Sequence, residues 1–391
     1  MSNIPKLRFP EFSGEWEEKR IDSIFDEKKE KNHPSEEVLT IIQGTGTVPR
    51  KASGRNIIFD EKSLSSYKFV QKDDFIIHLR SFEGGLEIAN SNGIVSPAYI
   101  IMHPKLLIAS KFYYSYFRSY KFINHVLPVS VEGVRDGRQI KYPILKEEKI
   151  PFTSFAEQQK IADFLSNVDS IITAETKILN TLQKKKKALM QKLFTQQLRF
   201  KSDNGTDFPE WEEKKLGEIA EFKQGYQILF SDQIQEPKEG YLRYLYISDF
   251  ISDKKILYVK DEESYYHISE KDICVANTGA TSGKPFRGQV GILSNNMFKI
   301  FLTNVIDEDF AWQFFNSPSY ENELQTFMNG AGQPHIGHKN MSSIHISLPC
   351  KAEQQKIADC LSSMDSLIQT QQKVVSTWQQ RKKALLQQMF A

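Results

Sequence analysis

The stretch Phe155 to Phe194, FAEQQKIADFLSNVDSIITAETKILNTLQKKKKALMQKLF, decides the fold because it occurs a second time. Its copy, Lys351 to Phe390, reads KAEQQKIADCLSSMDSLIQTQQKVVSTWQQRKKALLQQMF. The two align without a gap, and more than half of the positions are identical. A segment repeated within one chain indicates its architecture before any secondary structure is assigned. The chain is therefore predicted to contain two copies of one unit.

Apolar residues in each copy recur at alternating steps of three and four, which is typical of the a and d positions of a coiled coil. Neither copy contains Gly or Pro, so each is predicted to form one helix of about 60 Å, at a rise of about 1.5 Å per residue. The apolar seam residues are Leu165, Val168, Ile172, Leu179, Leu182 and Leu189 in the first copy, and Leu361, Met364, Ile368, Val375, Trp378 and Leu385 in the second.

Each seam needs an apolar partner, and the other copy supplies one. Because a globular segment of chain lies between the copies, antiparallel packing is predicted. Polar residues interrupt both seams at the same two steps, and this predicts that Glu175 opposes Lys382 while Lys186 opposes Gln371.

Two further matches lie outside the helices. Glu15 to Lys19, EWEEK, recurs as Glu210 to Lys214, and a fainter frame aligns residues 67–102 with 265–300. Short β-rich runs such as Phe75 to Ile77 alternate there with Gly- and Asn-bearing turns. Lys111 to Phe117 is predicted to be a helix packed on the sheet, with its tyrosines in the core rather than stacked on an extruded base. Residues 201–206 are predicted to be a flexible connector.

The predicted fold class is α+β: two globular domains separated by two long antiparallel helices that form a coiled coil, with an internal pseudo-twofold repeat. Residues 1–152 are assigned to the first globular domain and 153–200 to the first helix. Residues 201–349 form the second globular domain, and residues 350–391 form the second helix.

Composition excludes several classes of protein. Of 391 residues, 40% are hydrophobic and 26% charged, and no run approaches the roughly 18 apolar residues of a membrane span. The N-terminus has no secretory pattern, and the three cysteines Cys274, Cys350 and Cys360 form no CxxC pair, so a cytoplasmic location is expected. Net charge is only +2, which means that any surface for nucleic acid must be local.

Two globules related by a pseudo-dyad suit duplex DNA, because dimeric readers contact half-sites about one helical turn, roughly 34 Å, apart. The two globules differ in sequence. The two half-sites are therefore expected to differ, and the whole site is not expected to be a palindrome.

Helix length is expected to set the distance between the half-sites. Adding or removing one turn shifts a helix end by about 5.4 Å, so we expect a changed spacer preference and unchanged half-site sequences. Selection from duplexes with varied spacers measures this. Length variants that keep the parent spacer contradict the prediction.

The order of variable segment, AEQQKIADFL helix, second variable segment and AEQQKIADCL helix resembles the specificity subunit of type I restriction-modification enzymes over essentially the whole chain. Glu157-Gln158 with Ile161, and Glu353-Gln354 with Ile357, are similar to that family's repeated conserved regions. The resemblance implies that each globule is a target-recognition domain for double-stranded DNA. It also implies that two methyltransferase subunits and nuclease-translocase subunits dock on the chain.

The same resemblance places S-adenosylmethionine on the methyltransferase, and ATP and Mg²⁺ on the nuclease-translocase. No cofactor, metal or catalytic residue is expected in this chain. The nearest sequence to a phosphate loop, Gly279 to Lys284, has the wrong glycine spacing and is followed by Pro285. Ser96 to Tyr99 lacks the paired prolines of an adenine methyltransferase motif. His335 and His338 are interpreted as structural.

Candidate DNA contacts are donors on Gly-rich loops without acidic residues, because phosphate repels carboxylates and base edges need bidentate donors. In the first globule they are Thr45, Arg50, Lys51, Arg55, Arg80, Ser81, Arg135 and Arg138. In the second they are Lys223, Gln224, Asn277, Thr278, Thr281, Lys284, Arg287, Gln333 and His335. Arg80 and Thr278 occupy matched positions of the repeat. The basic runs 184–187 and 381–383 are interpreted as solvated helix faces, apart from the seam positions Lys186 and Lys382.

Two other functions compete with this prediction, and the second of them remains open. A methyltransferase or nuclease with its own recognition domains would need cofactor motifs and a further domain, for which the chain has no room. A non-enzymatic scaffold joining two protein-binding modules through a coiled coil would share the helices but enrich no two-part sequence from a random duplex library.

Overall fold

The computed structural model describes residues 4–54, 61–77, 85–133, 139–252, 255–261, 266–328 and 335–390. They form two compact units. Unit 1 comprises residues 1–177 with 373–391, and unit 2 comprises residues 178–372. Each unit therefore combines one globule with a part of both long helices.

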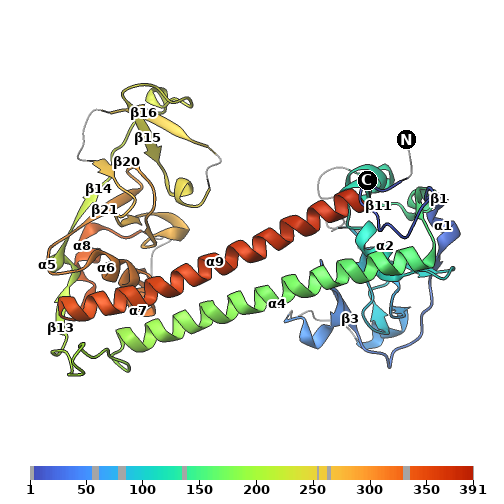
Figure 1. Cartoon of the computed structure of the whole chain (residues 1–391), viewed down its shortest axis with the longest axis horizontal. Coiled ribbons are helices and arrows are strands. Elements are labelled where there is room, and N and C mark those ends of the chain that lie inside the picture. Colours follow the sequence, from blue (N-terminus) through green and yellow to red (C-terminus); the bar gives the residue numbers. More distant parts are fainter. Residues whose placement is uncertain are drawn as a thin grey trace. The chain divides into compact units, whose positions relative to one another are not determined.

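The two long helices are α4 (Phe155–Phe194) and α9 (Lys351–Met389), and both are labelled in Figure 1. In unit 1, Leu165 near the start of α4 shares a core with Met389 at the end of α9. In unit 2, Leu193 near the end of α4 shares a core with Leu361 near the start of α9. Within each unit the helices thus run antiparallel, as predicted. None of the helices in the described part of the chain is long and apolar enough to span a membrane.

All of the seam positions, apolar and polar, are buried or half-buried. The polar partners differ from the prediction. In unit 2, Lys186 Nζ lies 2.6 Å from Asp365 Oδ1, and in unit 1, Lys382 Nζ lies 2.5 Å from Asp169 Oδ1. Each aspartate lies more than one helical turn before the partner predicted for that lysine. The physical reason is that apolar packing at the helix ends sets the register, and the lysines then take the carboxylates within reach.

In its described residues, unit 1 contains a four-stranded antiparallel sheet in the order β2-β9-β6-β7 and four two-stranded ladders, β1-β12, β3-β4, β5-β8 and β10-β11. The strands are β1 (Glu17–Arg20), β2 (Phe25–Lys28), β3 (Leu39–Ile42), β4 (Gly46–Pro49), β5 (Lys68–Val70), β6 (Phe75–Ile77), β7 (Glu87–Ile88), β8 (Gly93–Val95), β9 (Ile100–Pro104), β10 (Val131–Glu132), β11 (Gln139–Ile140) and β12 (Lys149–Phe152). The short helices are α1 (Ile21–Ile24), α2 (Ser110–Tyr116) and α3 (Tyr142–Leu145). Helix α2 buries Phe112, Tyr113 and Tyr116, so its tyrosines serve the core as predicted.

The described part of unit 2 contains two four-stranded sheets, β14-β21-β18-β19 and β16-β15-β20-β17, and the ladder β13-β22. The strands are β13 (Glu212–Lys215), β14 (Ala220–Gln224), β15 (Tyr241–Leu245), β16 (Leu257–Lys260), β17 (His267–Ile268), β18 (Cys274–Ala276), β19 (Pro285–Phe286), β20 (Gly291–Leu293), β21 (Met297–Leu302) and β22 (His345–Leu348). The short helices are α5 (Leu216–Ile219), α6 (Glu308–Phe315), α7 (Pro318–Met328) and α8 (His338–Ser343).

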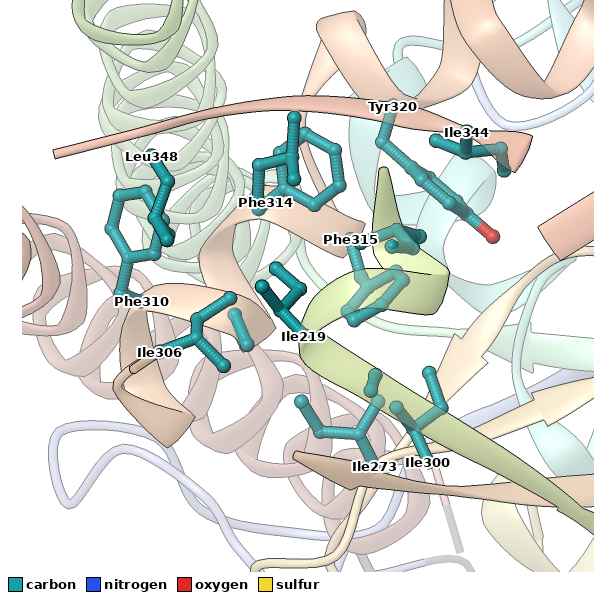
Figure 2. Packing of buried hydrophobic residues seen from close by; sticks show 14 of the residues in the cluster. Ile219, Ile273, Ile300, Ile306, Phe310, Phe314, Phe315, Tyr320, Ile344 and Leu348 are labelled. Atoms are coloured by element: carbon teal, nitrogen blue, oxygen red, sulfur yellow. The ribbon is translucent and has the colours of Figure 1, made fainter. Parts of the chain in front are cut away.

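The core of unit 2 is centred on α6. Figure 2 shows Phe310, Phe314 and Phe315 among aliphatic side chains from the surrounding elements. Phe194 from the end of α4 packs against Phe310, with ring centroids 5.6 Å apart. The end of one repeated helix therefore closes the core of this globule.

The internal repeat is visible strand by strand. Strands β6, β8 and β9 fall at the places in the aligned frame that β18, β20 and β21 occupy, and the sheet order β2-β9-β6-β7 recurs as β14-β21-β18-β19. Local bonds recur as well. Asp74 accepts a hydrogen bond from the Gln71 N–H at 2.8 Å, and the matched Asp272 accepts one from the Ser269 N–H at 2.6 Å.

The segment 201–206 differs from its prediction as a flexible connector, because it forms a compact turn. The Ser202 N–H donates to the Thr206 carbonyl at 2.9 Å, and the Gly205 N–H donates to the Ser202 carbonyl at 2.9 Å. An isolated antiparallel bridge joins Lys201 to Asp207. Its polar composition suits a tight turn as well as a linker, which is why composition alone did not distinguish them.

Candidate nucleic-acid interface

The Glu-Gln pair that opens α4 is buried and holds the globule of unit 1 to its helix. Both carboxylate oxygens of Glu157 accept hydrogen bonds from the Arg8 guanidinium, Oε1 from Nε at 2.7 Å and Oε2 from Nη2 at 2.8 Å. Gln158 accepts from the Ala109 N–H at 3.0 Å and donates to the Thr153 carbonyl at 2.7 Å. Bidentate Arg-carboxylate geometry is among the strongest polar contacts available to a protein. The pair is therefore part of the scaffold and not of a contact surface.

The second copy repeats this arrangement in unit 2. Glu353 accepts from Arg199 Nε at 3.2 Å and Nη2 at 2.9 Å, and from Trp211 Nε1 at 2.9 Å. Gln354 accepts from the Asp307 N–H at 2.6 Å and donates to the Pro349 carbonyl at 2.8 Å.

Sequence reasoning missed the two arginines. A signal was present, since Leu7 to Phe9 and Leu198 to Phe200 both read Leu-Arg-Phe and both precede the repeated EWEEK. Burial opposes ionisation of Glu157, but the hydrogen bonds from Arg8 and Thr153 outweigh it and hold the pKa of that carboxyl below its ordinary value. The ion pair with Arg8 is therefore fully formed at neutral pH.

In unit 1 the candidates Thr45, Arg50 and Lys51 gather around the β3-β4 hairpin. Thr45 is exposed in its turn. Arg50 and Lys51 follow β4 on a short 3-10 turn, Arg50–Ala52. Lys51 is exposed, whereas Arg50 is half-buried and its guanidinium lies 5.9 Å from the centre of the Tyr67 ring.

In unit 2 the structure brings together candidates from two separate windows. Thr278 and His335 face each other in an isolated antiparallel bridge. His335 and Lys284 are exposed, and Thr278 and Thr281 are half-buried. These four residues and the β3-β4 turn of unit 1 offer uncharged or basic donors at the surface, which is the chemistry that base edges and phosphates require.

Other candidates in unit 2 are engaged within the fold. Gln224 donates to the Met297 carbonyl at 3.2 Å, and Asn277 is buried and donates to the Asn295 carbonyl at 3.2 Å. Lys223 lies 4.5 Å from the Phe301 ring centre. Arg287 pairs with Asp309 at 2.9 Å. Their contacts make them supports of the surface, and a role in binding DNA stays a prediction for each.

Some candidates cannot be placed. Six of them lie outside the described residues: Arg55, Arg80, Ser81, Arg135, Arg138 and Gln333. Among the residues that the structure does describe, no three His, Cys, Asp or Glu side chains gather in a way that could hold a metal ion. His338 packs against Phe298, with ring centroids 5.0 Å apart, and burial lowers its pKa. This supports the structural interpretation of that histidine.

The family model for the type I restriction modification DNA specificity domain matches residues 13–184 and 209–376. The two matches cover most of the chain, and each contains one globule with a large part of its helix. The chain belongs to the type I restriction-modification specificity family. The resemblance noted in the sequence is thereby confirmed, and the two matches coincide with the internal repeat.

Curated members of this family are similar over most of their length. The type I restriction enzyme MjaVIII specificity subunit of Methanocaldococcus jannaschii is 27% identical over 339 residues, which cover 81% of this chain and 78% of that protein. The putative MjaX specificity subunit of the same organism is 26% identical over 422 residues, covering 98% and 95%. The relatives are named as specificity subunits, in agreement with the non-catalytic role expected from the sequence.

Solved structures share the fold. The crystal structure of the type I restriction-modification S subunit from M. genitalium has a TM-score of 0.61 at 19% identity and covers 99% of both chains. A structure reported for complex assembly and conformational transition of the type I R-M system has a TM-score of 0.58 at 15% identity, covering 96% of this chain and 97% of that one.

The basic runs on the two long helices, residues 184–187 and 381–383, are mostly exposed to solvent. Lys184, Lys185 and Lys187 are exposed, and so are Arg381 and Lys383. The two seam lysines are instead half-buried in ion pairs, as described above. Their burial confirms the prediction from the heptad pattern that Lys186 and Lys382 are seam positions, in contrast to the solvated residues beside them.

Proposed function

We propose that this chain supplies the DNA sequence preference of a type I restriction-modification complex, each globule reading one half of an asymmetric two-part site. The observation that carries this is one repeated strand frame with different polar residues at the surface of each globule. Unit 1 exposes the β3-β4 turn with Thr45, and unit 2 exposes His335, which is bridged to the half-buried Thr278. A shared scaffold with different surface residues is what two unlike half-sites need.

The proposed partners are two methyltransferase subunits, together with nuclease-translocase subunits in the complete restriction complex. Support comes from the outer faces of the helices. Exposed residues are identical at many matched positions of the two copies even though the globules diverge; examples are the pairs Asp163 and Asp359, Ser170 and Ser366, and Lys177 and Lys373. Equivalent surfaces suit two copies of the same partner.

The chemistry is assigned to those partners. S-adenosylmethionine is proposed for the methyltransferase, and ATP with Mg²⁺ for the nuclease-translocase, in the cytoplasm. This chain contributes binding and spacing, and its own side chains are assigned no bond-making step.

Selection from a random duplex library tests the proposal, using the purified chain assembled with its methyltransferase subunit. We expect two enriched sequence blocks that differ from each other and are separated by a fixed spacer. Thr278→Ala is expected to reduce discrimination by roughly tenfold or more at positions of one block, since a good base contact discriminates by about 1–3 kcal/mol. Thr377→Ala, an exposed threonine on α9, is the matched control and should change neither block.

The scaffold alternative gives the opposite result. A scaffold for two protein modules enriches no two-part sequence from the library, even with the methyltransferase present. That outcome would remove the proposed function.

A further inference from the structure

The β3-β4 hairpin of unit 1 ends in a tight turn whose three residues, Gln43, Gly44 and Thr45, are all exposed. Ile42 pairs with Gly46 across the base of the turn, and the Thr45 N–H donates to the Ile42 carbonyl at 3.0 Å. Gly44 and Gly46 have φ of +83° and +89°. A Cβ at Gly46 would come within 2.5 Å of the Ile88 carbonyl oxygen, so glycine is required at that position.

A buried carboxylate binds the backbone N–H groups of this turn. Glu87 on β7 accepts from the Gly44 N–H at 2.7 Å and the Gly46 N–H at 3.1 Å. It also accepts from Tyr114 Oη at 3.1 Å and from Arg118 Nη1 at 2.8 Å. The Glu87 side chain is only 4% exposed. Two backbone donors and one cation satisfy its charge, which a buried carboxylate requires.

Asn90 holds the same turn from its other side. Its Nδ2 donates to the carbonyls of Thr45 at 2.8 Å and Thr47 at 2.9 Å, and its backbone N–H donates to Thr47 Oγ1 at 2.9 Å. Side chains therefore bind the backbone of the turn on both sides. The Gln43 and Thr45 side chains remain at the surface on a rigid support, the arrangement that precise recognition requires.

The chemistry of the turn suits base edges. Residues 38–54 contain no Asp or Glu and carry Arg50 and Lys51, so the segment does not repel phosphate. The tip itself is uncharged, and the nearby Arg118 guanidinium is paired with Glu87. A glutamine amide matches the N6 and N7 positions of adenine in the major groove, and threonine can hydrogen-bond a base or contact a thymine methyl group.

Glu87 and Asn90, which bind the backbone of the turn in unit 1, have no equivalent at the matched positions of unit 2. In the frame that aligns residues 67–102 with 265–300, Glu87 corresponds to Pro285 and Asn90 to Gly288. Neither residue can supply the side-chain bonds that hold the turn in unit 1. A reader of this kind would act on one half-site alone.

We propose that Gln43 and Thr45 read base edges in the half-site of unit 1, and that Glu87 is the positioning residue that fixes them. The proposal rests on the proposed function and adds the residues that determine specificity in one half of the site. Lys51 is exposed at the opposite end of the same hairpin, after β4, where a phosphate contact would help fix the register on the duplex.

Gln43→Ala and Thr45→Ala test the tip, in the complex with the methyltransferase subunit and a random duplex library. We expect discrimination at adjacent base pairs of one block to fall about tenfold to a hundredfold for Gln43→Ala, the range of a bidentate base contact, and by less for Thr45→Ala, because one hydroxyl makes a single contact. The other block and the spacer should stay as in the parent chain. Gln197→Ala, an exposed glutamine that follows α4 and lies outside the repeated helix, is the matched control and should leave both blocks intact.

Glu87→Gln tests positioning. Its amide nitrogen cannot accept from a backbone N–H, so the turn loses part of its support. We expect weaker discrimination at the same base pairs, and little further loss when Gln43→Ala is combined with it. Circular dichroism and the melting temperature of each variant show whether unit 1 remains folded. A purely structural role would lower the melting temperature without changing preference at those base pairs.

Three outcomes overturn the inference. If folded Gln43→Ala and Thr45→Ala chains select the parent motif with undiminished discrimination, the turn does not read bases. If binding weakens equally on all sequences, the turn contacts phosphate instead. If the unmodified chain enriches no two-part motif, the proposed function fails, and the inference with it.

Discussion

Phe310→Ala is expected to lower the free energy of unfolding of unit 2 by about 3–5 kcal/mol, the usual cost of removing a buried aromatic ring. Phe310 is fully buried, is one of the core side chains shown in Figure 2, and packs against Phe194 from α4. Alanine removes the ring's apolar contacts and leaves a cavity that helices and strands on several sides cannot fill. Chemical denaturation, with hydrogen exchange read on peptides of residues 210–350, measures the loss.

Phe230→Ala is the matched control. It removes the same side chain in the same unit, but Phe230 is 81% exposed, so we expect a change within about 0.5 kcal/mol. Equal effects of the two substitutions would show that the core is not organised around α6.

Arg199→Met is expected to destabilise unit 2 by about 3–5 kcal/mol, because it leaves a buried carboxylate without its cation. The Glu353 side chain is 0% exposed, and Arg199 supplies both prongs of its ion pair. The bond from Trp211 would remain, but a neutral donor does not offset the desolvation of a full charge. Equilibrium denaturation at neutral pH measures the effect.

A second substitution separates loss of the charge pair from loss of packing. Adding Glu353→Gln to Arg199→Met removes the unpaired charge, so much of the lost stability should return. Lys383→Met, at an exposed position on α9, should change stability by no more than about 0.5 kcal/mol. If the double variant were no more stable than Arg199→Met alone, the buried charge would not be the cause.

The helices were predictable because their signal is local. The alternating spacing of Leu165, Val168 and Ile172 requires only a helical period, and each of these positions is buried or half-buried. The partners of Lys186 and Lys382 were not predictable in the same way. Register in an antiparallel pair depends on contacts at the helix ends, such as those of Met389 and Leu193, which the seam itself does not contain.

Long-range polar contacts were the main omission. Arg8 and Glu157 are 149 residues apart in sequence, and Gly44 and Glu87 are 43 apart. The repeated Leu-Arg-Phe marks Arg8 as a matched position, but no local pattern reveals which carboxylate either group binds. Composition also selected Asn277 as a candidate contact, yet its amide nitrogen bonds inward to a carbonyl. A donor on a loop has the same sequence signal whether it faces solvent or supports the turn. Side-chain direction was the information that the sequence lacked.

The end of α9 has a consequence for biosynthesis. Phe390 packs against Trp16 and Phe112, with ring centroids 6.3 and 5.3 Å away, inside the core of unit 1. Those partners are translated before unit 2, which is one uninterrupted stretch, residues 178–372, and Phe390 is translated after it. Domains generally fold as units during synthesis, so the core of the globule that is begun first is completed only after the whole of unit 2 has been made.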